Sequence, residues 1–225
     1  MKKRVLPILI ACCLMAALLP LAALAEEEVV AEEEAYNEDY FEDELWSDES
    51  WEDEEIDFVN PFPDVPNDAD YLEAVMYLAG AGIITGDGNG NFNPDAAITR
   101  AEVSAIVCRL MGEGDAASYI SRQLYQDVDS TNWAAGYIAK ATELGVFNGD
   151  GTGNFRPTDN VTYEQVIKIL VCACGYESEA QALGGWPNGY IAVAKDLGIT
   201  NGLSFRQTAN APRSAVAMLT YHTVF

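Results

Sequence analysis

The chain has 225 residues, with 36 Asp and Glu against 12 Lys and Arg, so its formal net charge is −24. Such an acidic chain, with no basic stripe to replace counterions on phosphates, is not expected to bind nucleic acid. Histidine occurs once, and the sequence has no GxSxG, HExxH or phosphate-loop pattern. We therefore expect no enzymatic activity, no catalytic residue, no metal site and no cofactor.

The N-terminus predicts export. Residues 2–4 are basic, residues 5–24 are mostly apolar, and small residues surround Ala25. This pattern is typical of a secretory signal peptide, here residues 1–25, cleaved after Ala25, and a retained membrane anchor is the alternative. The membrane is then a partner only through the signal peptide during export.

Residues 26–60 form an acidic segment with 18 Asp and Glu and no Lys or Arg. Like charges at this density repel one another and leave too little apolar surface to offset the entropy of ordering. The segment is predicted to be a disordered arm. It serves either as a solvating spacer or as a tail that recruits a protein partner, and in the second case the association should weaken steeply with salt.

The rest of the chain repeats. Residues 82–94 return as residues 145–157, displaced by 63 positions, and residues 132–149 return in weaker form as residues 185–202. Tandem self-similarity indicates an array of like units that share a core. We place repeat one at 61–112, a linker at 113–124, repeat two at 125–175 and a degenerate repeat three at 176–225.

Each repeat is predicted to be a helix, a glycine-rich loop and a second helix. In repeat one the first helix covers residues 69–81, and the loop at 85–94 carries Phe92, which together with its counterpart Phe155 should pack onto the core. The fold class is therefore mainly α.

The second helix of each repeat opens on a capping box. Thr99 with Glu102, and Thr162 with Gln165, can each satisfy free amides at the helix start. An apolar stripe follows each cap at helical spacing; its members are Val103, Ile106, Val107, Leu110 and Met111 in repeat one, and Val166, Ile169, Leu170, Ala173 and Cys174 in repeat two.

The loop of repeat one alternates Asp87, Asn89 and Asn91 as a calcium-binding EF-hand does. It departs from that pattern at position six, where Phe92 replaces glycine, and at position twelve, where Ile98 replaces glutamate. A structural turn is the favoured interpretation and a calcium site the alternative.

Three cysteines remain after the predicted signal: Cys108, Cys172 and Cys174. An odd number excludes a complete disulfide framework, and two of them are too close in sequence for a routine disulfide or a CxxC metal site. We expect free thiols.

Four short motifs of repeat one carry a resemblance to a known family: residues 62–65 (FPDV), 82–86 (GIITG), 88–94 (GNGNFNP) and 98–102 (ITRAE). In this order they resemble the S-layer homology (SLH) module. Residues 125–128, Trp133, 149–151 and 161–165 resemble a second module, and residues 183–225 resemble a third with a shortened loop.

The resemblance implies a noncatalytic cell-wall anchor. Three SLH modules form a mostly helical pseudotrimer, here a pseudo-threefold bundle, whose grooves bind secondary cell-wall polymers, often pyruvylated and linked to peptidoglycan. The expected location is therefore secreted, at the cell wall or cell surface. A guanidinium suits a carboxylate-bearing polymer, and flat aromatic faces suit sugar rings.

Carried over residue by residue, the signature arginine is Arg100 in repeat one and Arg213 in repeat three, whereas repeat two has Tyr163. The family tryptophan is Trp133 and Trp186. These five residues are the candidate glycan-binding set. No repeat holds both arginine and tryptophan in register, and adjacent repeats could combine them across a groove.

Structural alternatives exist for these residues. Arg100 could pair with a nearby acid at the helix start, the tryptophans could simply pack, and Arg213 lies in the most divergent surroundings. At the level of the whole chain, the alternative function is a surface adaptor that binds another protein through the degenerate array and the acidic arm.

Overall fold

The computed structural model describes residues 59–118 and 123–225. The predicted signal peptide, and the acidic arm up to residue 58, lie outside the described residues. Those described form seven α-helices and a 3₁₀ helix, and among them only isolated β-bridges occur in place of strands, so the mainly-α prediction is confirmed. The elements are α2 (Leu72–Gly80), α3 (Arg100–Leu110), η2 (Gly114–Ser118), α4 (Ala135–Glu143), α5 (Tyr163–Ala173), α6 (Glu177–Ala182), α7 (Asn188–Asp196) and α8 (Arg213–Tyr221).

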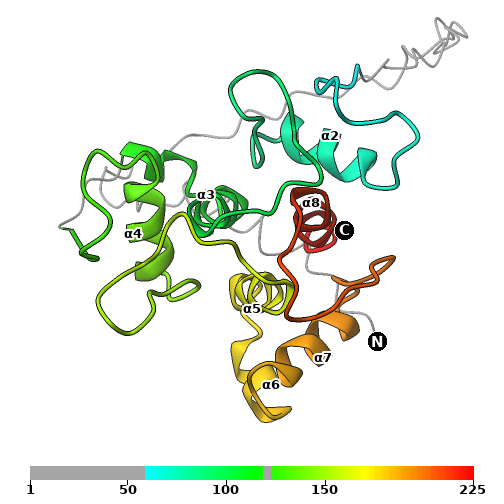
Figure 1. Ribbon diagram of the computed structural model, residues 1–225. Helices are drawn as coiled ribbons and strands as arrows, with labels where there is room; N and C mark the ends of the chain where they lie inside the picture. Colours follow the sequence, from blue (N-terminus) through cyan, green and yellow to red (C-terminus); the bar gives the residue numbers. More distant parts are fainter. Residues whose placement is uncertain (1–58, 119–122) are drawn as a thin grey trace, which may run out of the picture. The chain divides into compact units, whose positions relative to one another are not determined.

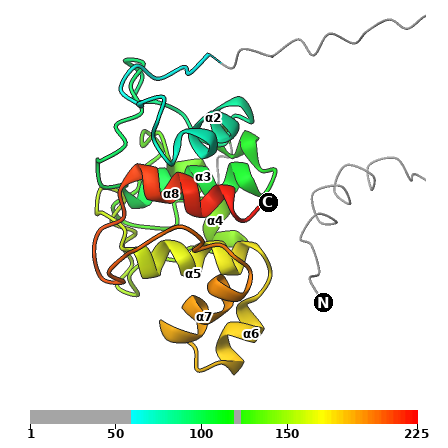
Figure 2. The ribbon, with the colours of Figure 1, turned by 90° about the vertical axis from the view of Figure 1, so that its right-hand side faces the viewer.

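Three helices, α3, α5 and α8, lie at the centre of this unit and are seen nearly end-on in Figure 1. An outer helix packs on each: α4 on α3, α7 on α5, and α2 on α8. Figure 2, turned by 90°, shows α8 and α5 running side by side, with α2 and α7 on opposite sides of the central helices. Each central helix therefore packs against the outer helix of the next predicted repeat, with α2 completing the cycle.

The segments just before the central helices are joined by a ring of three backbone hydrogen bonds. Ile98 N–H donates to the carbonyl of Ala211 at 3.0 Å, Val161 N–H to Ile98 at 3.0 Å, and Ala211 N–H to Val161 at 2.8 Å. All three residues are buried. Because each member both donates and accepts, the ring closes on itself and gives the centre approximate threefold symmetry.

The predicted helix start at Thr99 is confirmed. Glu102 Oε2 accepts from Thr99 N–H at 2.8 Å, and Thr99 Oγ1 accepts from Glu102 N–H at 3.3 Å. At Thr162 the residues stand in the same capping-box arrangement, and Gln165 Oε1 accepts from Thr162 N–H at 3.0 Å. Thr162 Oγ1 is buried without a hydrogen-bond partner among the described residues, so this cap is only half made.

The first helix of repeat one is shorter than predicted. Residues 69–71 form turns, with Ala69 N–H donating to Pro66 and Leu72 N–H to Ala69, and α2 begins at Leu72. The physical reason is local, because the amides of Ala69 and Leu72 bond the carbonyls three residues earlier, as in a turn, and the four-residue bonds of the α-helix begin with Val75 N–H to Tyr71. At the other end Gly82 has φ +69°, a conformation that glycine adopts without strain.

The two long loops are held by a carboxylate from the start of each repeat. Asp64 accepts from the N–H groups of Phe92 at 2.8 Å and Asn93 at 2.6 Å. Asp127 accepts from the equivalent amides of Phe155 at 2.8 Å and Arg156 at 2.7 Å. Both phenylalanine side chains are buried, which confirms the prediction that they pack onto the core.

The Asp87 side chain is engaged within its own loop. Its Oδ1 accepts from the N–H groups of Asn89 and Asn91, and its Oδ2 accepts from the side-chain amide of Asn93 at 2.9 Å. These bonds lower the pKa of Asp87 to about 2, with the Asn93 contact the largest cause. They support the interpretation of this loop as a structural turn.

The three cysteines are free thiols in the structure. Burial raises the pKa of Cys108 to about 12 and those of Cys172 and Cys174 to about 11, so all three are protonated at neutral pH. None of the described helices is both long enough and apolar enough to cross a membrane.

Candidate ligand-binding grooves

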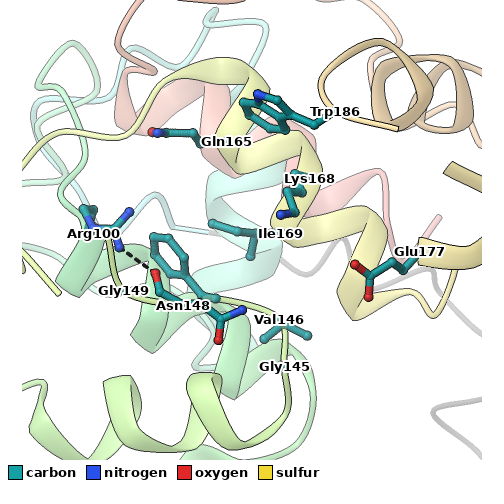
Figure 3. Close-up of a pocket in the computed structure, with 11 residues that line it drawn as sticks. Arg100, Gly145, Val146, Asn148, Gly149, Gln165, Lys168, Ile169, Glu177 and Trp186 are labelled. Atoms are coloured by element: carbon teal, nitrogen blue, oxygen red, sulfur yellow. Dashed lines mark hydrogen bonds between the residues drawn. The ribbon is translucent and has the colours of Figure 1, made fainter. Parts of the chain in front are cut away.

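The first groove lies between the start of α3, the loop before residue 150, helix α5 and the start of α7 (Figure 3). We call it the Arg100 groove; its volume is about 340 Å³. Its walls therefore come from three predicted repeats. The residues that line it are Arg100, Gly145, Val146, Phe147, Asn148, Gly149, Gln165, Lys168, Ile169, Glu177 and Trp186.

The second groove, which we call the Arg213 groove, has a volume of about 520 Å³. It lies between the start of α8, the loop around residues 85–88, helix α3 and Trp133, which precedes α4. Its lining includes Thr85, Gly86, Asp87, Gly88, Asn93, Ala96, Ala97, Glu102, Ala105, Ile106, Arg109, Trp133 and Arg213.

The two grooves are structural equivalents. Each combines a signature arginine at the first turn of one central helix with a tryptophan that precedes an outer helix of another repeat. Arg100 is thereby brought together with Trp186, and Arg213 with Trp133. The expectation that adjacent repeats supply the two side chains is met by the geometry.

Arg100 bridges two repeats through backbone carbonyls. Its Nε donates to Phe155 O at 2.7 Å and its Nη2 to Asn148 O at 2.8 Å, the bond drawn in Figure 3. The guanidinium lies 4.4 Å from the ring centroid of Phe147 and 4.5 Å from that of Phe155, a cation–π arrangement. The side chain thus both holds the loop and forms the wall of the groove.

The alternative that Arg100 pairs with an acid is wrong within the described residues, where no ion pair joins it to a carboxylate. Its Nη1 has no hydrogen-bond partner in that part of the chain. Burial lowers the pKa of Arg100, and the charge of Asp159 opposes the shift. The guanidinium is consequently a partly desolvated cation that forms no ion pair with any described carboxylate.

Arg213 makes the same two carbonyl contacts and one more. Its Nε donates to Phe92 O at 2.7 Å and its Nη2 to Thr85 O at 2.8 Å. In addition, Nη1 forms an ion pair with Glu102 Oε1 at 2.8 Å. Arg213 is therefore paired with an acid, which belongs to α3 and not to its own helix.

Both tryptophans remain accessible. Trp133 is 59% exposed and Trp186 is 46% exposed, although each ring also contacts a tyrosine edge-on, Tyr137 and Tyr190 respectively, with centroids 6.4 Å apart. The packing alternative is thus only part of their role. A large share of each indole surface faces solvent, where a sugar ring could lie against it.

Tyr163 occupies the position of the signature arginine on α5 but lines neither groove. Its ring stacks on Phe205 with centroids 5.0 Å apart and planes 13° from parallel. Burial raises the pKa of the Tyr163 hydroxyl. Where the other two repeats hold a guanidinium over the loop phenylalanine, this one holds a second aromatic ring.

Sequence reasoning did not single out three charged residues of the grooves: Lys168, Glu177 and Arg109. Lys168 Nζ lies 5.8 Å from the ring centroid of Trp186. Arg109 lies over Tyr137 at 5.0 Å and donates to its hydroxyl at 3.2 Å. Arg109 and Lys168 lie on the predicted second helices of repeats one and two, but only the cyclic packing shows which groove each of the three residues lines.

Comparison with known proteins agrees with this architecture. The family model for the S-layer homology domain matches residues 61–104 and 124–167. These segments contain the first two repeats from the loop-holding aspartate to the start of the central helix.

Similar proteins include a cell surface protein of Thermoanaerobacter kivui, 34% identical over 161 residues, which cover 71% of this chain and 20% of that protein. A middle cell wall protein of Brevibacillus brevis is 35% identical over 61% of this chain and 13% of its own length. An amylopullulanase of Thermoanaerobacterium thermosulfurigenes is 30% identical over 66% of this chain and 9% of its own length. This chain thus spans a fifth or less of each of these relatives.

The similarity points to a noncatalytic anchoring domain, while the absence of enzymatic activity in the whole protein stays a prediction. The relatives support a location at the cell wall or cell surface and an anchoring role there. Residues 61–104 and 124–167 of this chain thus match the S-layer homology domain.

Proposed function

We propose that this protein attaches noncovalently to an acidic, peptidoglycan-linked cell-wall glycan, with the Arg100 and Arg213 grooves as its binding sites. The observation that carries the proposal is the shared geometry of the two grooves. Each presents a signature arginine and an exposed indole from different repeats on one concave surface. A guanidinium can bond a carboxylate, and an indole can cover a sugar face.

Residues 176–225 are, in this proposal, a third and degenerate S-layer homology repeat. Three features support it: Ala211 is one member of the buried backbone ring, α8 packs beside α5, and Arg213 repeats the two carbonyl contacts of Arg100. The third repeat contributes Arg213 to one groove and Trp186 to the other. Tyr163 is proposed to have a packing role, which sets it apart from the other four candidates.

The test is cosedimentation of the full chain with purified cell-wall sacculi, before and after removal of their secondary polymers. Binding should require the polymer. The double variant Trp133→Ala, Trp186→Ala should lose most of the binding, because both side chains are exposed and their removal leaves the core intact. Arg206→Ala, an exposed arginine outside both grooves, is the matched control and should bind normally.

Arg100→Ala and Arg213→Ala should also abolish binding, but each removes contacts between repeats, so thermal unfolding by circular dichroism must accompany them. Equal binding of the tryptophan double variant and the control would overturn the proposal. Failure of the unchanged protein to bind intact sacculi would favour the protein adaptor.

A further inference from the structure

The two equivalent grooves differ in charge at one pair of matched positions. Glu102 on α3 and Gln165 on α5 occupy the same place in their capping boxes, 63 residues apart. In the Arg213 groove the carboxylate of Glu102 neutralises the guanidinium at 2.8 Å. In the Arg100 groove the neutral amide of Gln165 stands at that place, and Arg100 keeps its Nη1 without a partner among the described residues.

A second matched position increases the difference. Lys168 lines the Arg100 groove, whereas Ala105 lines the Arg213 groove. Each of these residues stands six positions after the N-cap of its helix, Thr162 and Thr99 respectively. Figure 3 shows Arg100 and Lys168 on different elements around the same pocket, with Trp186 beside Lys168. The lysine Nζ is 5.8 Å and 5.6 Å from the rings of Trp186 and Tyr190, which places its charge at the aromatic end of the groove.

The remaining charges do not remove this contrast. The Arg100 groove has one carboxylate, Glu177, which accepts from the Tyr190 hydroxyl at 3.2 Å. The Arg213 groove has two carboxylates, Glu102 and Asp87, against its two arginines. The first groove therefore has excess positive charge, and the second is balanced.

We propose that the two grooves divide the glycan between them: the Arg100 groove binds a sugar bearing a carboxylate, and the Arg213 groove binds an uncharged sugar of the same polymer. This rests on the proposed function. A ligand carboxylate entering the Arg100 groove gains Nη1 and Lys168 as donors and supplies a counter-ion that the half-buried guanidinium does not have among the described residues. In the Arg213 groove the same carboxylate would have to displace or approach Glu102, which costs binding energy.

Each groove has its own reporter for the test. The full chain contains four tryptophans, so a ¹⁵N–¹H correlation NMR spectrum shows four indole N–H signals. The signal of Trp133 reports on the Arg213 groove, and that of Trp186 reports on the Arg100 groove. Trp133→Phe and Trp186→Phe assign them. The two probes are a pyruvylated N-acetylhexosamine glycoside and its methyl ester, which has nearly the same shape but no charge.

With the acid, the Trp186 signal should respond at roughly tenfold lower concentration than Trp133, and with the ester that difference should disappear. Gln165→Glu should weaken the response of Trp186 to the acid by about tenfold, and Glu102→Gln should strengthen that of Trp133 by a similar factor. Both substitutions keep a side-chain oxygen for the cap, so the helix start is preserved.

Lys168→Gln should weaken only the response to the acid, and Lys195→Gln, an exposed lysine on α7 outside both grooves, is its control. Equal responses of Trp186 to the acid and the ester, with sacculus binding intact, overturn this inference and leave the proposed function in place. Loss of both the indole responses and sacculus binding in the unchanged protein overturns the two together.

Discussion

The loops of the first two repeats and the loop of the proposed third repeat are held on the core by different side chains. At 83–94 and 146–157 a carboxylate grips two backbone amides, and an arginine from another repeat covers a buried phenylalanine. The third loop, near residues 199–207, is shorter; its Phe205 is only partly buried and is covered by Tyr163. Among the described residues no carboxylate grips the amides of that loop.

This contrast shows which contacts tolerate sequence change. The three residues that start the central helices, Arg100, Tyr163 and Arg213, all donate their backbone N–H to the neighbouring repeat at 2.9–3.1 Å. Backbone donors make little demand on the side chain, so the centre stays regular even where the cap is Pro212 instead of threonine. The loops depend on particular side chains, and there the proposed third repeat differs from the first two.

The largest expected difference concerns the three loop phenylalanines. Phe155→Ala should destabilise the protein by about 3–5 kcal/mol, because it empties a fully buried site, and Phe92→Ala should do nearly the same. Phe205→Ala should cost only about 1–2 kcal/mol, because that ring is partly exposed. Urea unfolding followed by circular dichroism measures all three. Equal losses would show that the third loop is as firmly packed as the others.

The next largest losses of stability are expected for Asp64 and Asp127, the carboxylates that clamp the two long loops by accepting from two backbone amides each. Asp64→Ala leaves two backbone amides without their charged acceptor and should cost about 2–3 kcal/mol, with a smaller loss for the more exposed Asp127→Ala. The exposed Asp68→Ala is the control and should change the free energy of unfolding by less than about 0.5 kcal/mol. A loss at Asp64 no greater than at Asp68 would contradict the structural role of the clamp.

The two caps give a smaller and more selective effect. Thr99→Ala should destabilise by about 1 kcal/mol, because the Thr99 hydroxyl bonds both the amide and the side chain of Glu102. Thr162→Ala should cost less than about 0.5 kcal/mol, because its hydroxyl is buried without a partner among the described residues. The same unfolding measurement distinguishes them, and a reversed order would contradict the half-made cap.

The smallest effect is on pH dependence. Hydrogen bonds from Asn93 and Asn89 hold the pKa of Asp87 at about 2, below its ordinary value of 3.8. The folded state therefore binds the Asp87 proton less readily than the unfolded chain, so this stabilisation is present above about pH 4 and is lost as the pH falls toward 2. Asp87→Asn should show a shallower loss of stability over that window. Identical slopes for the two proteins would remove Asp87 as a contributor.

Much of the fold was predictable because it is encoded locally. The cap at Thr99, the apolar stripe from Val103 to Met111 and the core phenylalanines all follow from short spacings, and each is confirmed. The cap at Thr162 is only half made. The start of α2 was predicted three residues early. Helical spacing alone does not show that the amides of Ala69 and Leu72 bond carbonyls three residues earlier, as in a turn, before the α-helix begins.

The grooves were only partly predictable, because their walls come from segments far apart in sequence. Arg100 and Trp186 are 86 positions apart, and no pattern within one repeat relates them. The difference between Glu102 and Gln165 was visible as two versions of one cap. Its effect on an arginine of a different repeat follows only from the order in which the repeats pack around the centre.

The closed ring of backbone hydrogen bonds also limits the number of repeats that can pack around one centre. A linear stack of repeats can grow, because its last unit offers free surface to another. Here every donor in the ring formed by Ile98, Val161 and Ala211 already has its acceptor, so a fourth unit could enter only by breaking one of these bonds. Under the proposed function, stronger attachment to a repetitive polymer comes from many copies of the molecule acting together on the same surface.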